Sequence, residues 1–350
     1  FRRNGVVKIE KNKGAKLLPY DTLEGFVWKD HIKDRDFIPL SDEEIQKAMI
    51  CKFIENTTNN NDHGQSIYTG LGYILHGYKD PTIPKAVIIN DENLADNGRP
   101  EGGTGKGLLV KAIGHMIPLA PYNGKNSDFG NNRFAYQGVT RTTKAIFIDD
   151  VERNFPLEVL FSVLTDDLII ERKHRDVEIL SYKHSPKFIL TTNYTIKGGS
   201  SSYARRRFDI FLNSYYGAHR RPIDDFGCEF FHGWDDQEWN RFDNFMMACV
   251  SQYFDFGLME YRSPELEIKM LKNETSHEFW EVMEGKFGTI GERHRKGELK
   301  ARIAEANPSR FIKDLSDRQL KTWIDIFGNH KGYTITHGRD YSSYYEFEKR

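Results

Sequence analysis

The segment GRPEGGTGKGLLVKAIGHM, from Gly98 to Met116, places clustered glycines and a lysine directly before a helical pattern. Backbone N–H groups of glycine-rich turns can point at phosphate oxygens beside a helix N-terminus, and a lysine can reach the outer phosphates. The strict phosphate-loop pattern fails at Pro100 and at Gly107, where Ser or Thr is usual. An ordinary glycine-rich turn is the alternative interpretation. The candidate nucleotide-binding residues are Gly102, Gly103, Thr104, Gly105, Lys106, Gly107 and Leu108.

A second candidate motif, KAIFIDDVE, ends an apolar run with two acids and carries a third acid two residues later. Carboxylates at a strand end can hold Mg²⁺ and position an attacking water. We expect Asp149 and Asp150 to be the metal ligands, with Asp150 preferred as the base and Glu152 as its competitor. Solvated acids at the end of a strand are the alternative.

Two further motifs follow. KFILTTN ends in Asn193, whose amide could sense a γ-phosphate and orient water, although a strand-terminal Asn is also a common turn residue. ARRRFDIFL carries three arginines, and an arginine supplied across a subunit boundary can stabilise transition-state charge. Three consecutive arginines cannot all point the same way, so we select Arg206, with Arg205 and Arg207 as alternatives.

The elements that must position these residues follow from three apolar runs, at residues 85–90, 144–150 and 187–193. Each run is short, rich in Ile, Val and Phe, and lacks polar alternation, as expected of strands buried in a parallel sheet. The predicted fold class is therefore α/β. The expected domains are a small helical N-terminal domain over 1–64, the α/β core over 65–215, a helical region over 216–284 and a winged-helix-like end over 285–350.

Local patterns support this division. Ser41 begins a helical stretch, SDEEIQKAMICKFIEN, and Thr57–Gly64 is rich in turn residues. Near the C-terminus the pattern predicts a helix over Leu315–Gly332, with Ser316 or Asp317 near its start and Gly328 near its end. A β-ribbon, YTITHGRDYSSYYEF, follows.

The order and compactness of GGTGKG, IFIDDVE, FILTTN and RRRF resemble the superfamily 3 helicases of viruses, phages and plasmids, which are AAA+ ring ATPases. The resemblance covers about residues 65–215 and looks closest to phage primase-helicase proteins. It implies an AAA+ P-loop core that uses ATP and Mg²⁺ and assembles into a hexameric ring. It further implies that the ring acts on single-stranded and forked DNA during replication. It also implies an upstream primase domain, which would explain a chain that starts at Phe1.

The segment IIERKHRDVEIL, residues 169–180, is predicted to form a β-hairpin with a basic tip. In the helicase family that it resembles, the equivalent hairpin grips the backbone of single-stranded DNA, where basic side chains bond phosphates without reading sequence. A solvated charged turn is the alternative. The candidate DNA-binding residues are Arg172, Lys173, His174 and Arg175.

Composition limits the possible classes. The chain has 350 residues, a net charge of -1 and 38% hydrophobic residues, so it is globular and any basic surface must be local. Its three cysteines, Cys51, Cys228 and Cys249, lack paired metal spacing, which fits a reducing compartment. No apolar run reaches the ~20 residues of a membrane span. We expect a cytoplasmic protein of a bacterial host cell.

Two rival functions stay open at this stage. One is a degenerate P-loop module that binds DNA or assembles under nucleotide control, because Gly107 departs from the loop pattern. The intact set of Lys106, Asp149, Asp150 and Asn193 argues against such decay. The other rival is a different P-loop ATPase, such as a small-molecule kinase or a protein-remodelling AAA+ machine.

Overall fold

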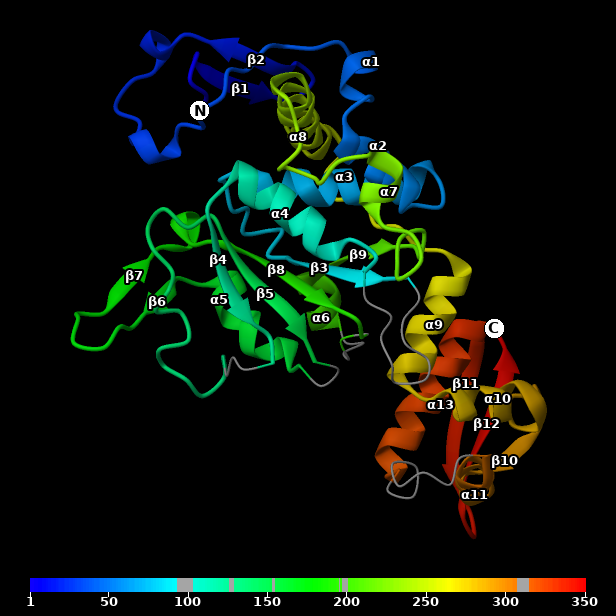
Figure 1. The fold of residues 1–350 in the computed structure, drawn as a ribbon. Helices are drawn as coiled ribbons and strands as arrows, with labels where there is room; N and C mark the ends of the chain where they lie inside the picture. Colours follow the sequence, from blue (N-terminus) through cyan, green and yellow to red (C-terminus); the bar gives the residue numbers. More distant parts are fainter. Residues whose placement is uncertain (93–102, 126–128, 153–154, 195, 197–200, 307–314) are drawn as a thin grey trace. The chain divides into compact units, whose positions relative to one another are not determined.

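The computed structural model describes residues 1–92, 103–125, 129–152, 155–194, 196, 201–306 and 315–350. The chain forms two compact units, Phe1–Arg262 and Ser263–Arg350 (Figure 1). None of the helices in these described ranges is both long and apolar enough to cross a membrane.

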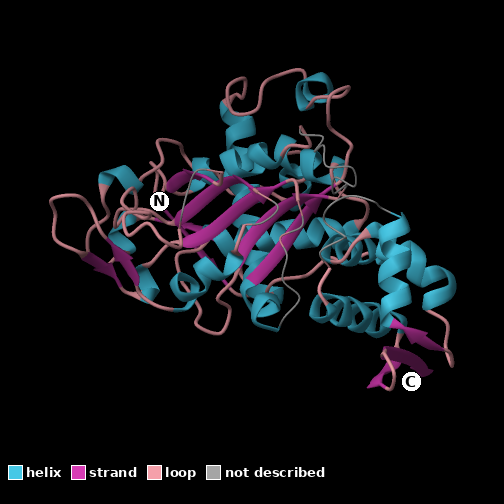
Figure 2. Ribbon diagram, turned by 90° about the horizontal axis from the view of Figure 1, so that it is seen from below, coloured by secondary structure: helices cyan, strands magenta, loops and turns pink. Residues whose placement is uncertain are grey.

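The first unit is built on a five-stranded sheet (Figure 2). Its strands lie in the order β4-β5-β8-β3-β9, and every neighbouring pair is parallel. The predicted α/β class is confirmed, and all three predicted strands are present. The strand β4 was not predicted, because Pro121 in its middle disfavours a strand; β4 lies at the sheet edge, where a missing N–H is tolerated. The strands are β3 (Ala86–Asp91), β4 (Leu119–Asn123), β5 (Ala145–Val151), β8 (Lys187–Thr192) and β9 (Arg207–Leu212).

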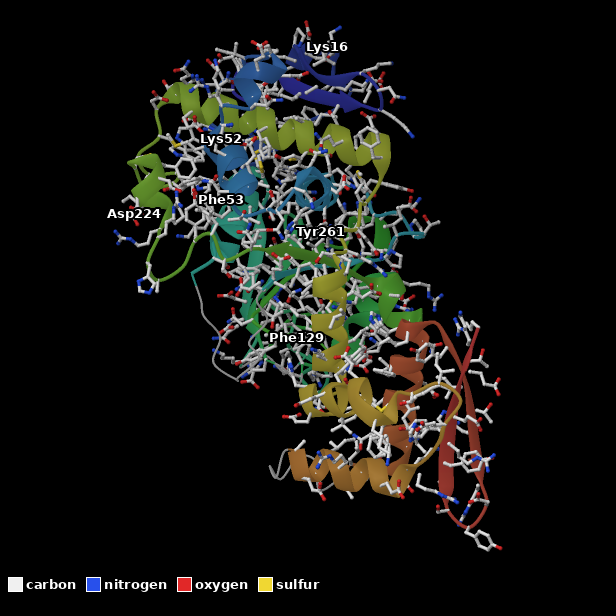
Figure 3. The ribbon with its side chains drawn as sticks, turned by 90° about the vertical axis from the view of Figure 1, so that its right-hand side faces the viewer. Lys16, Lys52, Phe53, Phe129, Asp224 and Tyr261 are labelled. Atoms are coloured by element: carbon white, nitrogen blue, oxygen red, sulfur yellow. The ribbon has the colours of Figure 1, made fainter. Side chains whose placement is uncertain are left out.

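Both faces of the sheet are covered, which explains why its strands lack polar alternation. Val87 and Ile89 of β3 pack into one core, whereas Ala86 and Ile88 pack into a second core. Figure 3 marks the two cores, with Phe53 in the first and Phe129 in the second. The helices that contribute to the cores or flank the sheet are α3 (Asn61–Leu75), α4 (Lys106–Met116), α5 (Phe161–Thr165), α6 (Ser201–Arg206) and α8 (Asp236–Phe256).

The N-terminal segment differs from the expected helical domain. It begins with an antiparallel hairpin of β1 (Val6–Glu10) and β2 (Gly14–Leu18). The single helix expected from Ser41 is divided into α1 (Asp42–Ile45) and α2 (Met49–Asn56). Ser41 caps α1 as predicted, but the Met49 N–H donates to the Glu238 carboxylate of α8 at 2.6 Å, so a tertiary contact starts the second helix.

The expected turn-rich linker is also shorter than predicted. The helix α3 begins at Asn61, inside that segment, and the Asn60 side chain accepts a hydrogen bond from the His63 N–H. Asn is a preferred N-cap, so the same residues that indicated a turn begin a helix. One core includes Phe53, Ile210 and Phe245, so apolar packing crosses the boundaries expected at residues 64 and 215.

The second unit has its own core around Trp280, Leu320 and Tyr345. The predicted helix and ribbon are present, and the helix ends at Lys331 with Gly332, at φ +72°, as its C-cap, so Gly328 lies in the last turn of the helix. A Cβ on Gly328 would lie 2.4 Å from Ile335 Cδ1, so this glycine permits close packing of the ribbon. The elements are α9 (Pro264–Glu274), α10 (His277–Val282), the π-helical η5 (Met283–Phe287), β10 (Arg293–Arg295), α11 (Lys296–Ala306), α13 (Asp317–Lys331), β11 (Tyr333–Arg339) and β12 (Ser343–Lys349).

The ribbon strands form an antiparallel three-stranded sheet in the order β10-β12-β11. The remaining short elements belong to the first unit. They are the 3₁₀ helices η1 (Tyr20–Thr22), η2 (Lys29–His31), η3 (Leu157–Leu160) and η4 (Tyr182–His184), the strands β6 (Leu168–Ile170) and β7 (Glu178–Leu180), and the helix α7 (Pro222–Phe226).

Candidate active site

The glycine-rich segment leads directly into α4, as predicted. Gly103 and Gly105 have φ values of +105° and +106°, and Gly105 is the N-cap of the helix that starts at Lys106. A Cβ on Gly105 would lie 2.3 Å from the Phe53 ring, so both the backbone and the packing require glycine there. Gly102, the first of the predicted loop residues, lies outside the described residues.

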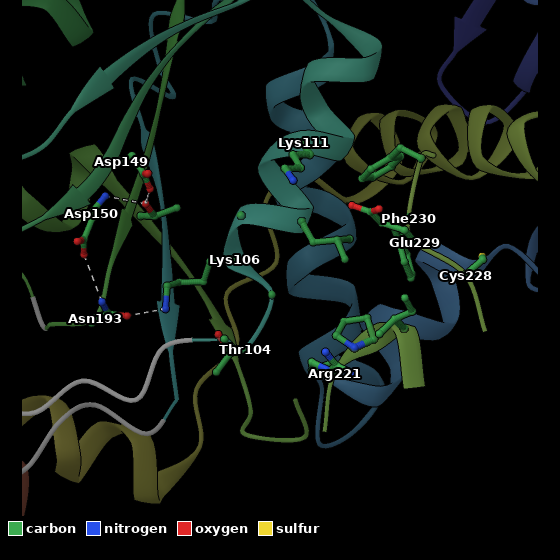
Figure 4. Close-up of a pocket in the computed structure, with 18 residues that line it drawn as sticks. Thr104, Lys106, Lys111, Asp149, Asp150, Asn193, Arg221, Cys228, Glu229 and Phe230 are labelled. Atoms are coloured by element: carbon green, nitrogen blue, oxygen red, sulfur yellow. Dashed lines mark hydrogen bonds between the residues drawn. The ribbon is translucent and has the colours of Figure 1, made fainter. Parts of the chain in front are cut away.

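The lysine of the loop meets two strand ends. Lys106 Nζ donates to Asn193 Oδ1 at 2.7 Å (Figure 4). Lys106 also forms an ion pair with Asp91, which is buried at the end of β3. The Thr104 hydroxyl donates to the same Asp91 carboxylate. Asp91 was missed by the sequence analysis, because the predicted strand stopped one residue before it. The position of an acid after the apolar run KAVIIN was the available signal.

The acid pair lies at a local irregularity of the sheet. The pairing of β5 with β8 shifts register between Ile148 and Val151, and Asp150 has a positive φ of +51°. Such bulges redirect side chains and are common beside active sites. The Thr191 hydroxyl donates to Asp149 Oδ1 at 2.6 Å, and the Asp150 N–H donates to the same hydroxyl at 2.9 Å.

Asp150 is linked to its neighbours on two sides. Asn193 Nδ2 donates to Asp150 Oδ1 at 3.2 Å, so one amide side chain joins Asp150 to Lys106 (Figure 4). Lys125, which follows β4, forms an ion pair with the other carboxylate oxygen at 2.5 Å. The hydrogen bond to Asp150 raises the pKa of the exposed Lys125 amine. Lys125 was not predicted as a site residue.

Lys106, Asp149, Asp150, Thr191 and Asn193 line a pocket of about 710 Å³, whereas Asp91 and Lys125 are not among its lining residues. The pocket lies at the carboxyl ends of β3 and β8. From β3 the chain continues to strands on one side of the sheet, β4, β5 and β8, and it then crosses to β9 on the other side of β3. Open α/β sheets bind ligands at such a switch point. The opposite wall comes from the segment around α7, which the sequence analysis did not assign to the site. Its lining residues are Arg221, Pro222, Ile223, Cys228, Glu229, Phe230 and Phe231.

The residues can satisfy the preferences of Mg²⁺. Asp149 lines the pocket, and the Thr191 hydroxyl bonds one of its two carboxylate oxygens. Mg²⁺ prefers carboxylate oxygens and retains several waters, so Asp149 with water and phosphate oxygens is a suitable donor set. No group of three or more His, Cys, Asp or Glu side chains gathers into a metal-binding cluster within the described ranges.

Some predicted residues lie elsewhere. Glu152 is exposed and does not line the pocket. Arg207 forms a bidentate ion pair with Asp209, with both hydrogen bonds at 2.7 Å. Its guanidinium is therefore bound to a carboxylate of the same strand, β9. Arg206 lies over the Phe161 ring at 4.7 Å, whereas Arg205 is exposed.

The predicted hairpin is present. The strands β6 and β7 pair antiparallel, with Ile169 opposite Ile179. Arg172 is held by Glu178, at 2.9 Å, and by the carbonyl oxygen of Gln137, at 3.1 Å. The other basic residues of the turn are exposed, namely Lys173, His174 and Arg175.

A family model described as "Family of unknown function (DUF5906)" matches residues 99–207, which include Lys106, the acid pair and Asn193. No curated protein matches the chain. Among solved structures, the chain is similar to the apo A form of the C-terminal region of NrS-1, with 12% identity, 97% of this chain and 82% of that chain covered, and a TM-score of 0.46.

Two other structures show weaker similarity. A JCV helicase bound to a thiazolopyridine compound has 13% identity, with 71% of this chain and 72% of that chain covered and a TM-score of 0.30. Drosophila ORC bound to DNA has 11% identity, with 94% of each chain covered and a TM-score of 0.24.

Proposed function

We propose that this protein is an ATP-dependent DNA helicase of the superfamily 3, AAA+ type, which assembles as a ring and translocates on single-stranded DNA. The observation that carries the proposal is the hydrogen-bonded series Lys106–Asn193–Asp150 in one pocket at the switch point of a parallel sheet. Three sequence segments contribute one member each. A chance glycine-rich turn gives no reason for a lysine, an amide and a carboxylate to meet there.

In this proposal the phosphates of ATP lie against the backbone of residues 103–108, and Lys106 exchanges one of its acceptors for a phosphate oxygen. Asp149 holds Mg²⁺, which when bound would neutralise phosphate charge. Asp150 accepts the proton of the attacking water. Its link to Asn193 lets that amide orient the water and respond to the outer phosphate. Glu152 remains the alternative base, although it is exposed outside the pocket.

The pocket also has a wall that suits the rest of a nucleotide. Pro222, Ile223, Phe230 and Phe231 supply apolar and aromatic surface opposite the phosphate loop. Such surfaces take the planar base, while polar groups fix the phosphates. A volume of about 710 Å³ lies within the usual range for small-ligand sites.

The proposed ring assembly rests on an arginine that acts across a subunit boundary. Arg206 is the proposed finger that reaches the ATP of a neighbouring subunit, with Arg205 as the exposed alternative. Arg207 is a weaker candidate, because releasing it would leave the Asp209 carboxylate without its bidentate partner. A finger acting in trans requires a closed assembly, and we propose a hexameric ring.

The DNA contacts are proposed for the hairpin of β6 and β7. Lys173, His174 and Arg175 are exposed at its turn and could bond successive phosphates of a single strand. Arg172 instead braces the hairpin through Glu178. Residues 285–350, which lie within the second unit, are proposed to form a winged-helix-like domain, supported by a helix followed by a β-ribbon.

The test is ATP hydrolysis by the purified chain with and without single-stranded DNA, beside a Lys106→Ala control. Stimulation by DNA that disappears in Lys106→Ala is the expected result, and a strand-displacement assay on forked DNA then tests unwinding. DNA binding without Lys106-dependent turnover, in protein shown to be assembled, would instead support the degenerate nucleotide-controlled module.

A further inference from the structure

Neither packing nor backbone conformation demands a glycine at position 107. Gly107 is exposed in the first turn of α4, and a Cβ there would meet no atom within 4 Å. It is also absent from the residues with positive φ, unlike Gly103 and Gly105. A serine or threonine would therefore fit, and the missing hydroxyl needs another explanation.

A lysine lies one helical turn further along the same face of α4. Gly107 and Lys111 are separated by four residues, about 6 Å along the axis, and both line the pocket. Side chains on a helix lean toward its N-terminus, so the stem of Lys111 extends over the turn that contains Gly107. Figure 4 shows Lys111 on α4, with Asp149 and Asp150 on one side of the view and Glu229 on the other.

Lys111 differs from the other cations of the pocket in its contacts. Lys106 bonds Asp91 and Asn193, and Arg221 forms an ion pair with Asp224 at 3.0 Å. Among the residues that the structure describes, Lys111 makes no ion pair or side-chain hydrogen bond, and it is exposed. Its amine is therefore available to a ligand that enters the pocket.

We propose that Lys111 is a second phosphate-binding lysine, which bonds the polyphosphate of the nucleotide across the space that Gly107 leaves open. A Ser or Thr side chain at position 107 would stand between the Lys111 stem and the phosphates, because it would occupy the turn over which that stem leans. The lysine supplies positive charge to a pocket whose two walls carry Asp149 and Asp150 on one side and Glu229 on the other, and so offsets their repulsion of a polyphosphate. This inference rests on the proposed nucleotide site.

The test measures direct binding of a fluorescent ATP analogue, with competition by ATP, by inorganic tripolyphosphate and by AMP. Tripolyphosphate has no base or sugar, so it reports phosphate contacts alone. Lys111→Met should weaken the binding of ATP and of tripolyphosphate about tenfold, the usual order for losing a charged hydrogen bond. The affinity for AMP should stay within about twofold of the parental value. Lys111→Arg should retain most of the affinity, and Lys144→Met is the matched control, since Lys144 is exposed outside the pocket.

A second comparison tests the role of Gly107. In a protein that already carries Gly107→Thr, Lys111→Met should reduce the affinity for tripolyphosphate less than it does in the parent. The introduced threonine already keeps the lysine from the phosphates. Equal tripolyphosphate affinity of the parent and Lys111→Met would overturn the inference. If Lys106→Ala abolishes binding while Lys111→Met does not weaken it, the inference fails and the nucleotide site stands. If the parent binds neither ATP nor tripolyphosphate, both fail.

Discussion

Replacing Gly105 with alanine should damage both the stability of the first unit and its affinity for ATP. Gly105 has φ +106°, and an added Cβ would lie 2.3 Å from Phe53 Cζ and 2.7 Å from Phe53 Cε2. The Phe53 ring cannot move freely, because it is fully buried and stacks on Tyr216 with ring centroids 5.4 Å apart. Backbone strain of about 1–2 kcal/mol and overpacking of about 1–3 kcal/mol give a cost of roughly 3 kcal/mol.

Thermal unfolding followed by circular dichroism measures this cost. A loss of about 3 kcal/mol should lower the transition of a unit of this size by roughly 6–12 °C. Gly107→Ala is the matched control for stability, because position 107 is helical and open; it should raise stability by about 0.5–1 kcal/mol. Titration with a fluorescent ATP analogue should show weaker binding by Gly105→Ala. A Gly105→Ala protein with the parental transition and the parental affinity would refute the reasoning.

The remaining predictions concern turnover, DNA and acid stability. Asn193→Ala should lower kcat of ATP hydrolysis about tenfold to a hundredfold with little change in KM, because the amide orients Asp150 and Lys106 without supplying a charge; an unchanged kcat would exclude this role. Replacing Lys173, His174 and Arg175 together with alanine should weaken single-stranded DNA binding. It should also reduce the slope of log Kd against the logarithm of the salt concentration by about 2. A variant with the parental slope would contradict the assignment of the hairpin to DNA binding. His76 is half-buried, and this burial and then the nearby Lys187 lower its pKa from 6.5 to about 3. The unfolded chain therefore binds the extra proton first, and stability should fall as pH decreases from about 6.5 toward 3. Chemical unfolding at pH 7.5 and pH 5 should show a smaller loss for His76→Gln than for the parent, and an equal loss would contradict the assignment.

Local chemistry was readable from the sequence. The glycines and Lys106 occupy consecutive positions, and the acid pair and Asn193 directly follow apolar runs, so adjacent residues alone indicate a phosphate loop and polar strand ends. The basic hairpin and the C-terminal helix with its ribbon were predicted for the same reason. Backbone conformation and side-chain periodicity depend mainly on near neighbours along the chain.

Long-range packing decided the rest. Contacts between different segments of the chain bring Asp91 to Lys106 and pack Phe53 against Gly105. They also place Phe230 in the pocket that the loop of residues 103–108 lines. The pairing of Arg207 with Asp209 also needed the side-chain directions on β9, since the sequence left Arg205 and Arg207 as alternatives to Arg206. Such contacts depend on the order of strands in the sheet and on how side chains fill the space between layers. The sequence by itself therefore determined which residues are candidates for a nucleotide site, and the tertiary structure decided which of them face one pocket.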